Sequence, residues 1–140
     1  MDEYIPLLLA GILTFVFGWN NSAILIGNER GSGTLSGAAT VVAGESHACA
    51  LTGGGGVDCW GSNTEGELGD NTTVTSGAPV VVLGAGGTGT LSGATIIAAG
   101  EVHTCALLDT GGVDCWGLNA SGQLGNGTLT TSYTPIAVDF

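Results

Sequence analysis

The fold is decided by a stretch that occurs twice, first as HACAL (47–51), VDCWG (57–61) and GELG (66–69). The second copy reads HTCAL (103–107), VDCWG (113–117) and GQLG (122–125). Every landmark recurs at an offset of 56 residues, without insertion or deletion. A fixed period of this kind is typical of architectures in which each repeat is one supersecondary unit. Residues 33–140 therefore form two copies of one unit.

Each unit is predicted to be a small antiparallel sheet. Short apolar and β-branched runs alternate with turns rich in Gly, Asn and Asp, which is the pattern of strands joined by tight connections. The strands are expected at 40–43, 47–51, 57–61 and 79–83 in the first unit, and at 95–99, 103–108, 113–117 and 133–138 in the second. The predicted fold class is thus mainly β, with two four-stranded blades.

The chain is acidic and rich in glycine. Its 140 residues include 27 glycines, 12 acids and a single basic residue, Arg30, which gives a formal net charge of −11. Nucleic acid is not expected as a partner, because phosphate contacts require Lys and Arg. The charge favours solubility and the attraction of cations.

The four cysteines fall into two matched pairs, Cys49 with Cys59 and Cys105 with Cys115. Two cysteines ten residues apart across a turn suit a bridge within a hairpin, so both pairs are predicted to form disulfides. The alternative is a metal site of His47, Cys49 and Cys59, which lacks a fourth ligand within the repeat. Disulfides persist in oxidising compartments, and the sequence therefore predicts an extracellular or cell-surface location.

The amino-terminal segment is hydrophobic. Residues 4–19 carry no charge, and residues 4–26 together are long enough to cross a bilayer as a helix. We expect one N-terminal α-helix here, either a membrane anchor or the packed core of a polymer. A cleaved signal peptide is the third interpretation, although its amino end would ordinarily be basic and here holds Asp2 and Glu3.

Gly18, Asn20 and Asn21, followed by Gly27, form a Gly-x-Asn-Asn pattern within residues 1–36. This segment resembles the first transmembrane helix of archaeal inorganic phosphate transporters, which implies polar side chains that bind phosphate or its coupling cation. Such transporters need two inverted multi-helix halves, and the sequence has no second hydrophobic span, so a complete transporter is excluded. The simpler interpretation is that the asparagines end or kink the helix.

A second resemblance covers the repeats. The order A-G-E-x-H-x-C-A-L, then V-D-C-W-G-x-N and G-x-L-G, makes residues 33–140 similar to the regulator-of-chromosome-condensation propeller repeat. The resemblance implies four-stranded blades around an axis. Two blades cannot close a ring, so sheet edges and a blade face remain to be covered. The family's nucleotide-exchange activity and chromatin binding are not expected here, because the basic tail is missing and the net charge is negative.

Other prominent residues are assigned structural roles. His47 and His103 occupy equivalent positions, which favours a structural imidazole over a metal ligand or general base. Trp60 and Trp116 are expected to cover the disulfides in the blade core. The acid before each second cysteine is expected to cap a turn rather than bind calcium. No catalytic residue, metal or cofactor is predicted, and the chain is not expected to be an enzyme.

Four Asn-x-Ser/Thr sequons occur, at Asn20, Asn71, Asn119 and Asn126. The last three lie in predicted turns of the repeats, so they are the glycosylation candidates if the protein is exported.

The predicted organisation is a hydrophobic helix at residues 1–26, a Gly-rich hinge at 27–37, and repeats at 38–88 and 89–140. It predicts an extracellular structural or interaction protein that self-associates through its exposed edges, with a pilus-like filament subunit as the specific version. One alternative is a membrane-anchored ligand-binding propeller module that reaches the membrane through residues 4–26. Another is a fragment or fusion that joins a phosphate transporter helix to a propeller remnant.

Overall fold

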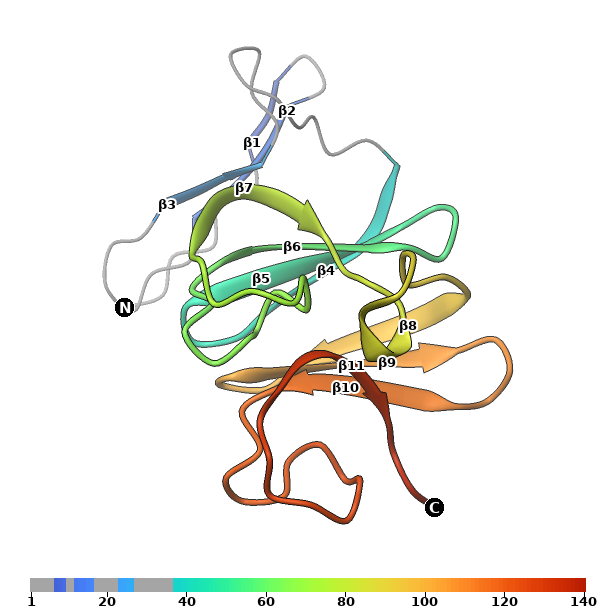
Figure 1. Cartoon of the computed structure of the whole chain (residues 1–140). Helices are drawn as coiled ribbons and strands as arrows, with labels where there is room; N and C mark the ends of the chain where they lie inside the picture. Colours follow the sequence, from blue (N-terminus) through green and yellow to red (C-terminus); the bar gives the residue numbers. More distant parts are fainter. Residues whose placement is uncertain (1–6, 10–11, 17–22, 27–36) are drawn as a thin grey trace.

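The computed structural model describes residues 7–9, 12–16, 23–26 and 37–140. Within these residues the chain is built from antiparallel sheets (Figure 1). The first is a three-stranded sheet of β1 (Leu7–Leu9), β2 (Ile12–Val16) and β3 (Ala23–Ile26), paired in sequence order.

The N-terminal α-helix expected for residues 1–26 is not supported. Where the structure describes this segment, it forms β1, β2 and β3, and a short apolar run alone does not distinguish a strand from a buried helix. The described residues include no helix of the length and hydropathy that a bilayer crossing requires. The rest of the segment, with residues 27–36 of the predicted hinge, lies outside the described residues.

Two four-stranded blades follow, as the repeat predicts. The strands of the first blade, in order across the sheet, are β4 (Ala38–Ala43), β5 (His47–Thr52), β6 (Val57–Gly61) and β7 (Ser76–Val81). Those of the second are β8 (Ala94–Ala99), β9 (His103–Leu108), β10 (Val113–Gly117) and β11 (Ser132–Ala137). A 3₁₀ turn, η1 (Ala85–Gly87), lies between the blades in sequence. The mainly β class with two antiparallel blades is confirmed, and the described residues form no closed ring.

The repeated glycines fit places where the backbone approaches itself closely. Gly61 ends β6 with a φ of 104°, and a Cβ added there would lie 2.8 Å from the Cα of His47. Gly117 ends β10 with the same φ and the same separation from the Cα of His103. Only glycine combines this φ with such proximity at low cost, so both blades turn out of their third strand in the same way.

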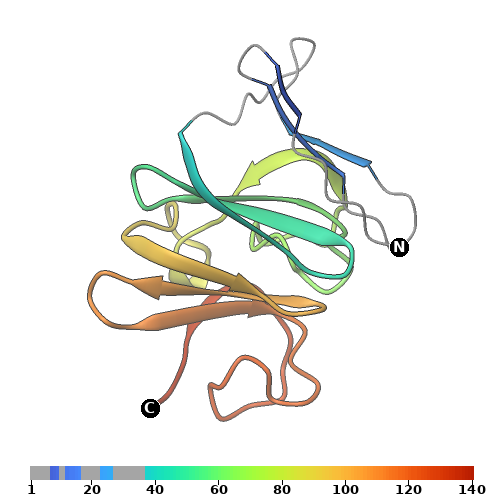
Figure 2. The same cartoon turned by 180° about the vertical axis from the view of Figure 1, so that it is seen from behind.

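The core lies between the two blades, which are stacked face to face (Figure 2). Alternate residues of β5 and β6 point toward the second blade, and residues of β8, β9 and β10 pack against them from that blade. The first blade contributes Cys49, Leu51, Val57 and Cys59 to the buried cluster, and the second contributes Ile97, Ala106 and Trp116. The strands β1–β3 lie on the side of the first blade that faces away from the second (Figures 1 and 2).

Candidate functional site

The joint between the blades holds a buried imidazole. His47, the first residue of β5, is 2% exposed, and its Nε2 lies 2.8 Å from the Oγ1 of Thr104 in β9. The Sγ of Cys49 lies 3.8 Å from the same hydroxyl. Burial, and to a smaller degree the charge of His103, lowers the pKa of His47 to about 4. The ring is therefore uncharged at neutral pH, and it links the blades by a hydrogen bond rather than by charge.

A second polar link crosses the joint from the other blade. The indole Nε1 of Trp116 donates a 2.8 Å hydrogen bond to the carbonyl oxygen of Glu67. Trp116 also belongs to the same buried cluster as Cys49 and Cys59 of the neighbouring blade. Trp60, its counterpart, is 1% exposed, and its Nε1 has no hydrogen-bond partner in the described part of the chain.

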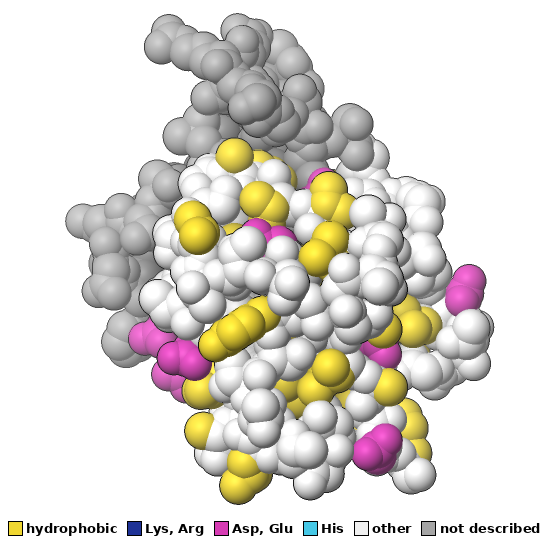
Figure 3. Space-filling model, in the orientation of Figure 1, with side chains coloured by type: hydrophobic (Ala, Val, Ile, Leu, Met, Phe, Trp, Pro, Cys, Tyr) yellow, Lys and Arg dark blue, Asp and Glu magenta, His cyan; other side chains and the backbone are white. Residues whose placement is uncertain are grey.

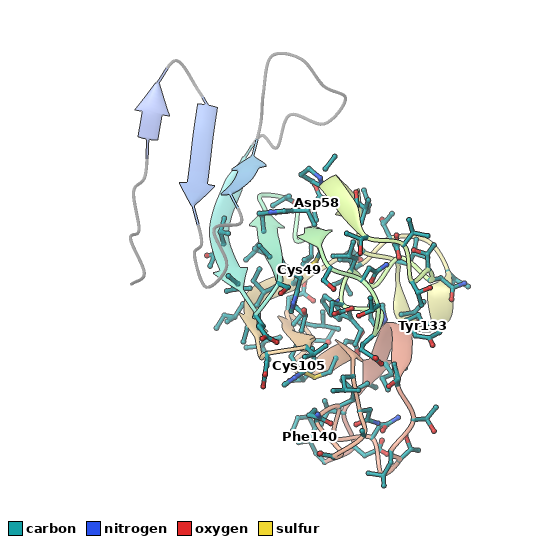
Figure 4. The ribbon with its side chains drawn as sticks, turned by 90° about the vertical axis from the view of Figure 1, so that its left-hand side faces the viewer. Cys49, Asp58, Cys105, Tyr133 and Phe140 are labelled. Atoms are coloured by element: carbon teal, nitrogen blue, oxygen red, sulfur yellow. A yellow bond between two sulfur atoms is a disulfide. The ribbon has the colours of Figure 1, made fainter. Side chains whose placement is uncertain are left out.

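The cysteines lie in register across the central hairpin of each blade. Cys49 and Cys59 are direct partners on β5 and β6, with Cα atoms 4.0 Å apart and sulfurs joined at 2.11 Å. Cys105 and Cys115 repeat this on β9 and β10, at 4.1 Å and 2.10 Å. Figure 4 labels Cys49, on the side of its blade that faces the joint, and Cys105 in the second blade. The register places each pair side by side whatever its redox state.

Two exposed acids come together at one edge of the joint. Glu45 and Glu101 occupy equivalent turns, before β5 and before β9, and the backbone N–H of Glu45 donates a 2.9 Å hydrogen bond to the carbonyl of Glu101. Both residues are exposed. Residues 37–140 contain nine acids and no Lys or Arg, and Figure 3 shows acidic but no basic side chains on the face that it draws. We call the turns of Glu45 and Glu101 the acidic edge.

The acids before the second cysteines do not cap turns. Asp58 lies within β6 and Asp114 within β10, on the face of each blade that carries its tryptophan. Desolvation by burial raises the pKa of both carboxyls. No group of three or more His, Cys, Asp or Glu in the described residues is arranged to hold a metal ion.

The glycosylation candidates differ in accessibility. Asn119 is 0% exposed: its Nδ2 donates to the carbonyls of Thr128 and Thr130, and its Oδ1 accepts from the N–H of Leu124. The folded chain therefore leaves no room for a sugar on Asn119. Asn71 is exposed and Asn126 half-buried, and these two stay predictions. The sequon at Asn20 lies outside the described residues.

Sequence reasoning missed Thr104, the carbonyl of Glu67 and the buried Asn63. The Nδ2 of Asn63 donates to the carbonyls of Thr72 and Val74, as that of Asn119 does in its own loop. The signal for Thr104 was the break in the repeat, because the equivalent residue in the first blade is Ala48. The buried asparagines could have been found from their recurrence, because Asn63 and Asn119 each lie two residues after a Trp-Gly pair.

Proteins similar to this chain include two curated relatives and one of known structure. Human RCC2 is 39% identical over 95 residues, which make up 65% of this chain and 17% of RCC2. The human E3 ubiquitin-protein ligase HERC2 is 36% identical over 104 residues, 73% of this chain and 2% of HERC2. Yeast RCC1 (Prp20), solved with Kap60 bound, shares the fold with a TM-score of 0.67 at 19% identity, over 93% of this chain and 32% of that chain. The matched residues thus make up less than a fifth of the length of RCC2 and of HERC2.

These relatives overturn the predicted function, partners and location. They are RCC1-type proteins and a ubiquitin-protein ligase, and a further structure of Prp20p from Saccharomyces cerevisiae is described by its binding to Gsp1p and histones. The extracellular, self-associating, pilus-like subunit was therefore the wrong prediction, and the relatives do not support a cell-surface or membrane-anchored module. The error has a physical source, since cysteines that are partners in a hairpin lie close in any compartment.

The family models agree with the repeat boundaries. A model of the Regulator of chromosome condensation (RCC1) repeat matches residues 38–67 and 94–123, one match in each blade. A second model of the same description matches residues 55–107, so the matches together run from 38 to 123. The resemblance of residues 1–36 to phosphate transporters is not supported. On the repeated blades, the joint between them and these matches, the chain belongs to the family of RCC1-repeat proteins.

Proposed function

We propose that the chain is a non-catalytic protein-interaction module whose acidic edge binds a basic protein segment. The observation that carries the proposal is the juxtaposition of Glu45 and Glu101 on exposed turns that are hydrogen-bonded to each other. Exposed carboxylates on two adjoining turns, within residues 37–140 that contain no Lys or Arg, create a negative potential that attracts Lys- and Arg-rich partners.

The repeat places one acid of the acidic edge in each blade. Each unit supplies one acid in the order Gly-Glu-x-His, and the stacking of the blades sets successive acids side by side. Prp20p is described as binding histones, which are basic proteins. A basic protein segment therefore fits both the charge of this chain and what is described for a relative of the same fold, whereas the phosphates of nucleic acid fit neither.

The proposal is tested by fluorescence anisotropy of a labelled Lys- and Arg-rich histone-tail peptide titrated with the full chain. An acidic peptide of the same length is the negative control. We expect saturable binding to the basic peptide that weakens as the salt concentration rises. Exposed charges more than about 8 Å apart are largely screened at physiological ionic strength, and added salt shortens this distance.

The variant pair E45Q/E101Q removes the acidic edge, and E65Q/D109N removes two acids elsewhere as the matched control. Exposed pairs contribute about 0.2–1 kcal/mol each, so E45Q/E101Q is expected to weaken binding about fivefold and the control less than twofold. Equal losses in the two variants, or no binding by the unmodified chain, would overturn the proposed function.

A further inference from the structure

The acidic edge and Tyr133 lie at the same end of the second blade. Gly117, the last residue of β10, is paired with His103 on one side and with Ser132 on the other. Glu101 lies two residues before His103, and Tyr133 directly follows Ser132. Since neighbouring strands are about 5 Å apart, roughly 10 Å separates the start of β9 from the start of β11. One extended peptide can therefore contact both.

Tyr133 is held in place by a loop of the first blade. Its carbonyl oxygen accepts a 2.9 Å hydrogen bond from the backbone N–H of Asn71. A Cβ added to Gly66 would meet the Cδ1 of Tyr133 first, and it would lie 2.8 Å from the Cα of Tyr133. The ring thus packs on a stretch of backbone that has no side chain. An aromatic ring positioned in this way loses little conformational freedom when a partner binds.

Much of Tyr133 is nevertheless open to solvent. The residue is 43% exposed and lies at the periphery of the molecule (Figure 4). Gly77, the equivalent residue of the first blade 56 positions earlier, is also exposed, although the second blade packs beside the first. A neighbouring blade therefore does not cover this position. Because Gly77 has no side chain, only one of the two repeats presents an aromatic ring here.

An exposed tyrosine ring at the same end of the blade as two carboxylates is suited to a cation. The face of an aromatic ring carries partial negative charge and attracts the side chains of Arg and Lys. The planar guanidinium of Arg stacks on such a ring, whereas the ammonium of Lys is a compact and strongly hydrated charge. Residues 37–140 contain no Lys or Arg that could occupy the ring instead. The chemistry of the site therefore favours an arginine from a partner.

We propose that Tyr133 selects an arginine of the basic segment that binds the acidic edge. The inference rests on the proposed function, and it adds the identity of one partner side chain and the place where that side chain binds. One basic residue of the segment pairs with Glu101, and an arginine three positions away stacks on Tyr133. In the polyproline II conformation, which unfolded chains commonly adopt, three residues advance about 9 Å and return the side chain to the same face. This spacing matches the separation of the two contacts.

The test compares two labelled peptides, one with Arg and the other with Lys at every basic position, by fluorescence anisotropy with the full chain. We expect the Arg peptide to bind about threefold more tightly, because an exposed cation–π contact changes affinity by a factor of about two to five. Tyr133→Phe keeps the ring and should keep this ratio. Tyr133→Leu keeps an apolar side chain without a ring and should lower the ratio to about one. Val81→Ala, at the 51% exposed residue that ends β7, is the matched control and should leave the ratio unchanged.

NMR of the bound Arg peptide gives a second measurement that does not depend on affinity. The δ-methylene protons of an arginine stacked on a ring are shifted upfield by the ring current. We expect this shift with the unmodified chain and with Tyr133→Phe, and its loss with Tyr133→Leu. If saturating amounts of the unmodified chain produce no upfield shift, the proposal is overturned whether or not the Leu variant folds.

The variant pair E45Q/E101Q separates this inference from the proposed function. It should weaken the binding of both peptides by the same factor and leave their ratio unchanged. If it does so while Tyr133→Leu keeps the preference for Arg, the arginine site is wrong and the acidic edge stands. If Tyr133→Leu removes the preference and E45Q/E101Q has no effect, the arginine site stands and the acidic edge is wrong. Failure of both peptides to bind the unmodified chain overturns both.

Discussion

Trp60 and Trp116 stand in the same five-residue strand sequence, yet they have different interactions. Trp116 donates its indole N–H to Glu67 of the neighbouring blade, whereas the buried Nε1 of Trp60 has no partner in the described residues. The cysteine pairs differ likewise, since Cys49 is 0% exposed and Cys105 is half-buried. The local sequence determines the strands of each blade, and contact with the neighbouring blade determines how much each side chain contributes to stability. The same substitution in the two blades should therefore have unequal effects.

The largest effect is expected at the cysteine pairs. Both pairs are disulfides, and removal of a native disulfide from a small domain costs about 2–5 kcal/mol. C49A/C59A should lower the free energy of unfolding by about 4 kcal/mol, because it also leaves a cavity at the buried joint, and C105A/C115A by about 3 kcal/mol. Urea unfolding of the two double variants measures the difference. An unfolding midpoint that thiol reduction leaves unchanged would show that the sulfurs are not bridged.

The next effect is the pH dependence that His47 confers. The pKa of His47 is about 4 in the folded chain, against an ordinary value of 6.5, so between these pH values the unfolded state binds a proton that the folded state does not. The stability that results from this difference is fully present above pH 6.5 and is lost as the pH falls toward 4, which lowers the free energy of unfolding by about 3 kcal/mol in all. Urea unfolding at a series of pH values measures the slope.

His47→Gln should flatten that slope, whereas His103→Gln should keep most of it, because desolvation rather than the charge of His103 is the larger cause. Burial raises the pKa of Asp58 and Asp114, so protonation of these carboxyls stabilises the folded chain as the pH falls through their pKa values. The stability that His47 contributes is therefore obtained by subtracting the pH profile of His47→Gln from that of the unmodified chain. Equal slopes in the unmodified chain and His47→Gln would refute the assignment.

Gly66→Ala and Gly122→Ala test whether the two equivalent glycine loops differ in how closely they are packed. Both glycines have a positive φ, 81° and 78°, so alanine strains both by about 1 kcal/mol. Only at Gly66 does the new methyl also press on Tyr133, which should add about 2 kcal/mol. Thermal unfolding of both variants gives the difference directly, and equal losses would mean that the first loop does not pack on the second blade.

The smallest effect is expected at the tryptophans. Phe removes similar volume at either position, but only Trp116→Phe leaves the Glu67 carbonyl without its donor. Trp116→Phe should therefore destabilise the chain by about 1 kcal/mol more than Trp60→Phe. If the two variants unfold at the same urea concentration, the indole bond across the joint contributes nothing measurable.

The strands of the blades were predictable because their pattern is local and repeated. The structure places β9 at His103–Leu108 and β10 at Val113–Gly117, the ranges that alternation and turn residues indicate. The joint was not predictable from the same pattern, because its contacts run between residues more than 45 positions apart, and one of them rests on Thr104, where the repeat is broken. Nor does a backbone acceptor such as the Glu67 carbonyl leave a mark in the sequence.

Two other sequence inferences failed for physical reasons. A sequon in a loop suggests exposure, but the loop around Asn119 is held together by that side chain, which is therefore buried. The spacing of Cys49 and Cys59 does not identify an oxidising compartment, because it follows from the register of one hairpin.

The acceptor that Trp116 uses is a main-chain atom, and this bears on how such a chain can change over generations. Glu67 stands where the second unit has Gln123, and every amino acid carries the carbonyl that the joint requires. An in-frame duplication of 56 codons copied from the second unit would encode a donor, an acceptor, a histidine and a hydroxyl together. Such a duplication would therefore carry its own donor and acceptor to the new boundary.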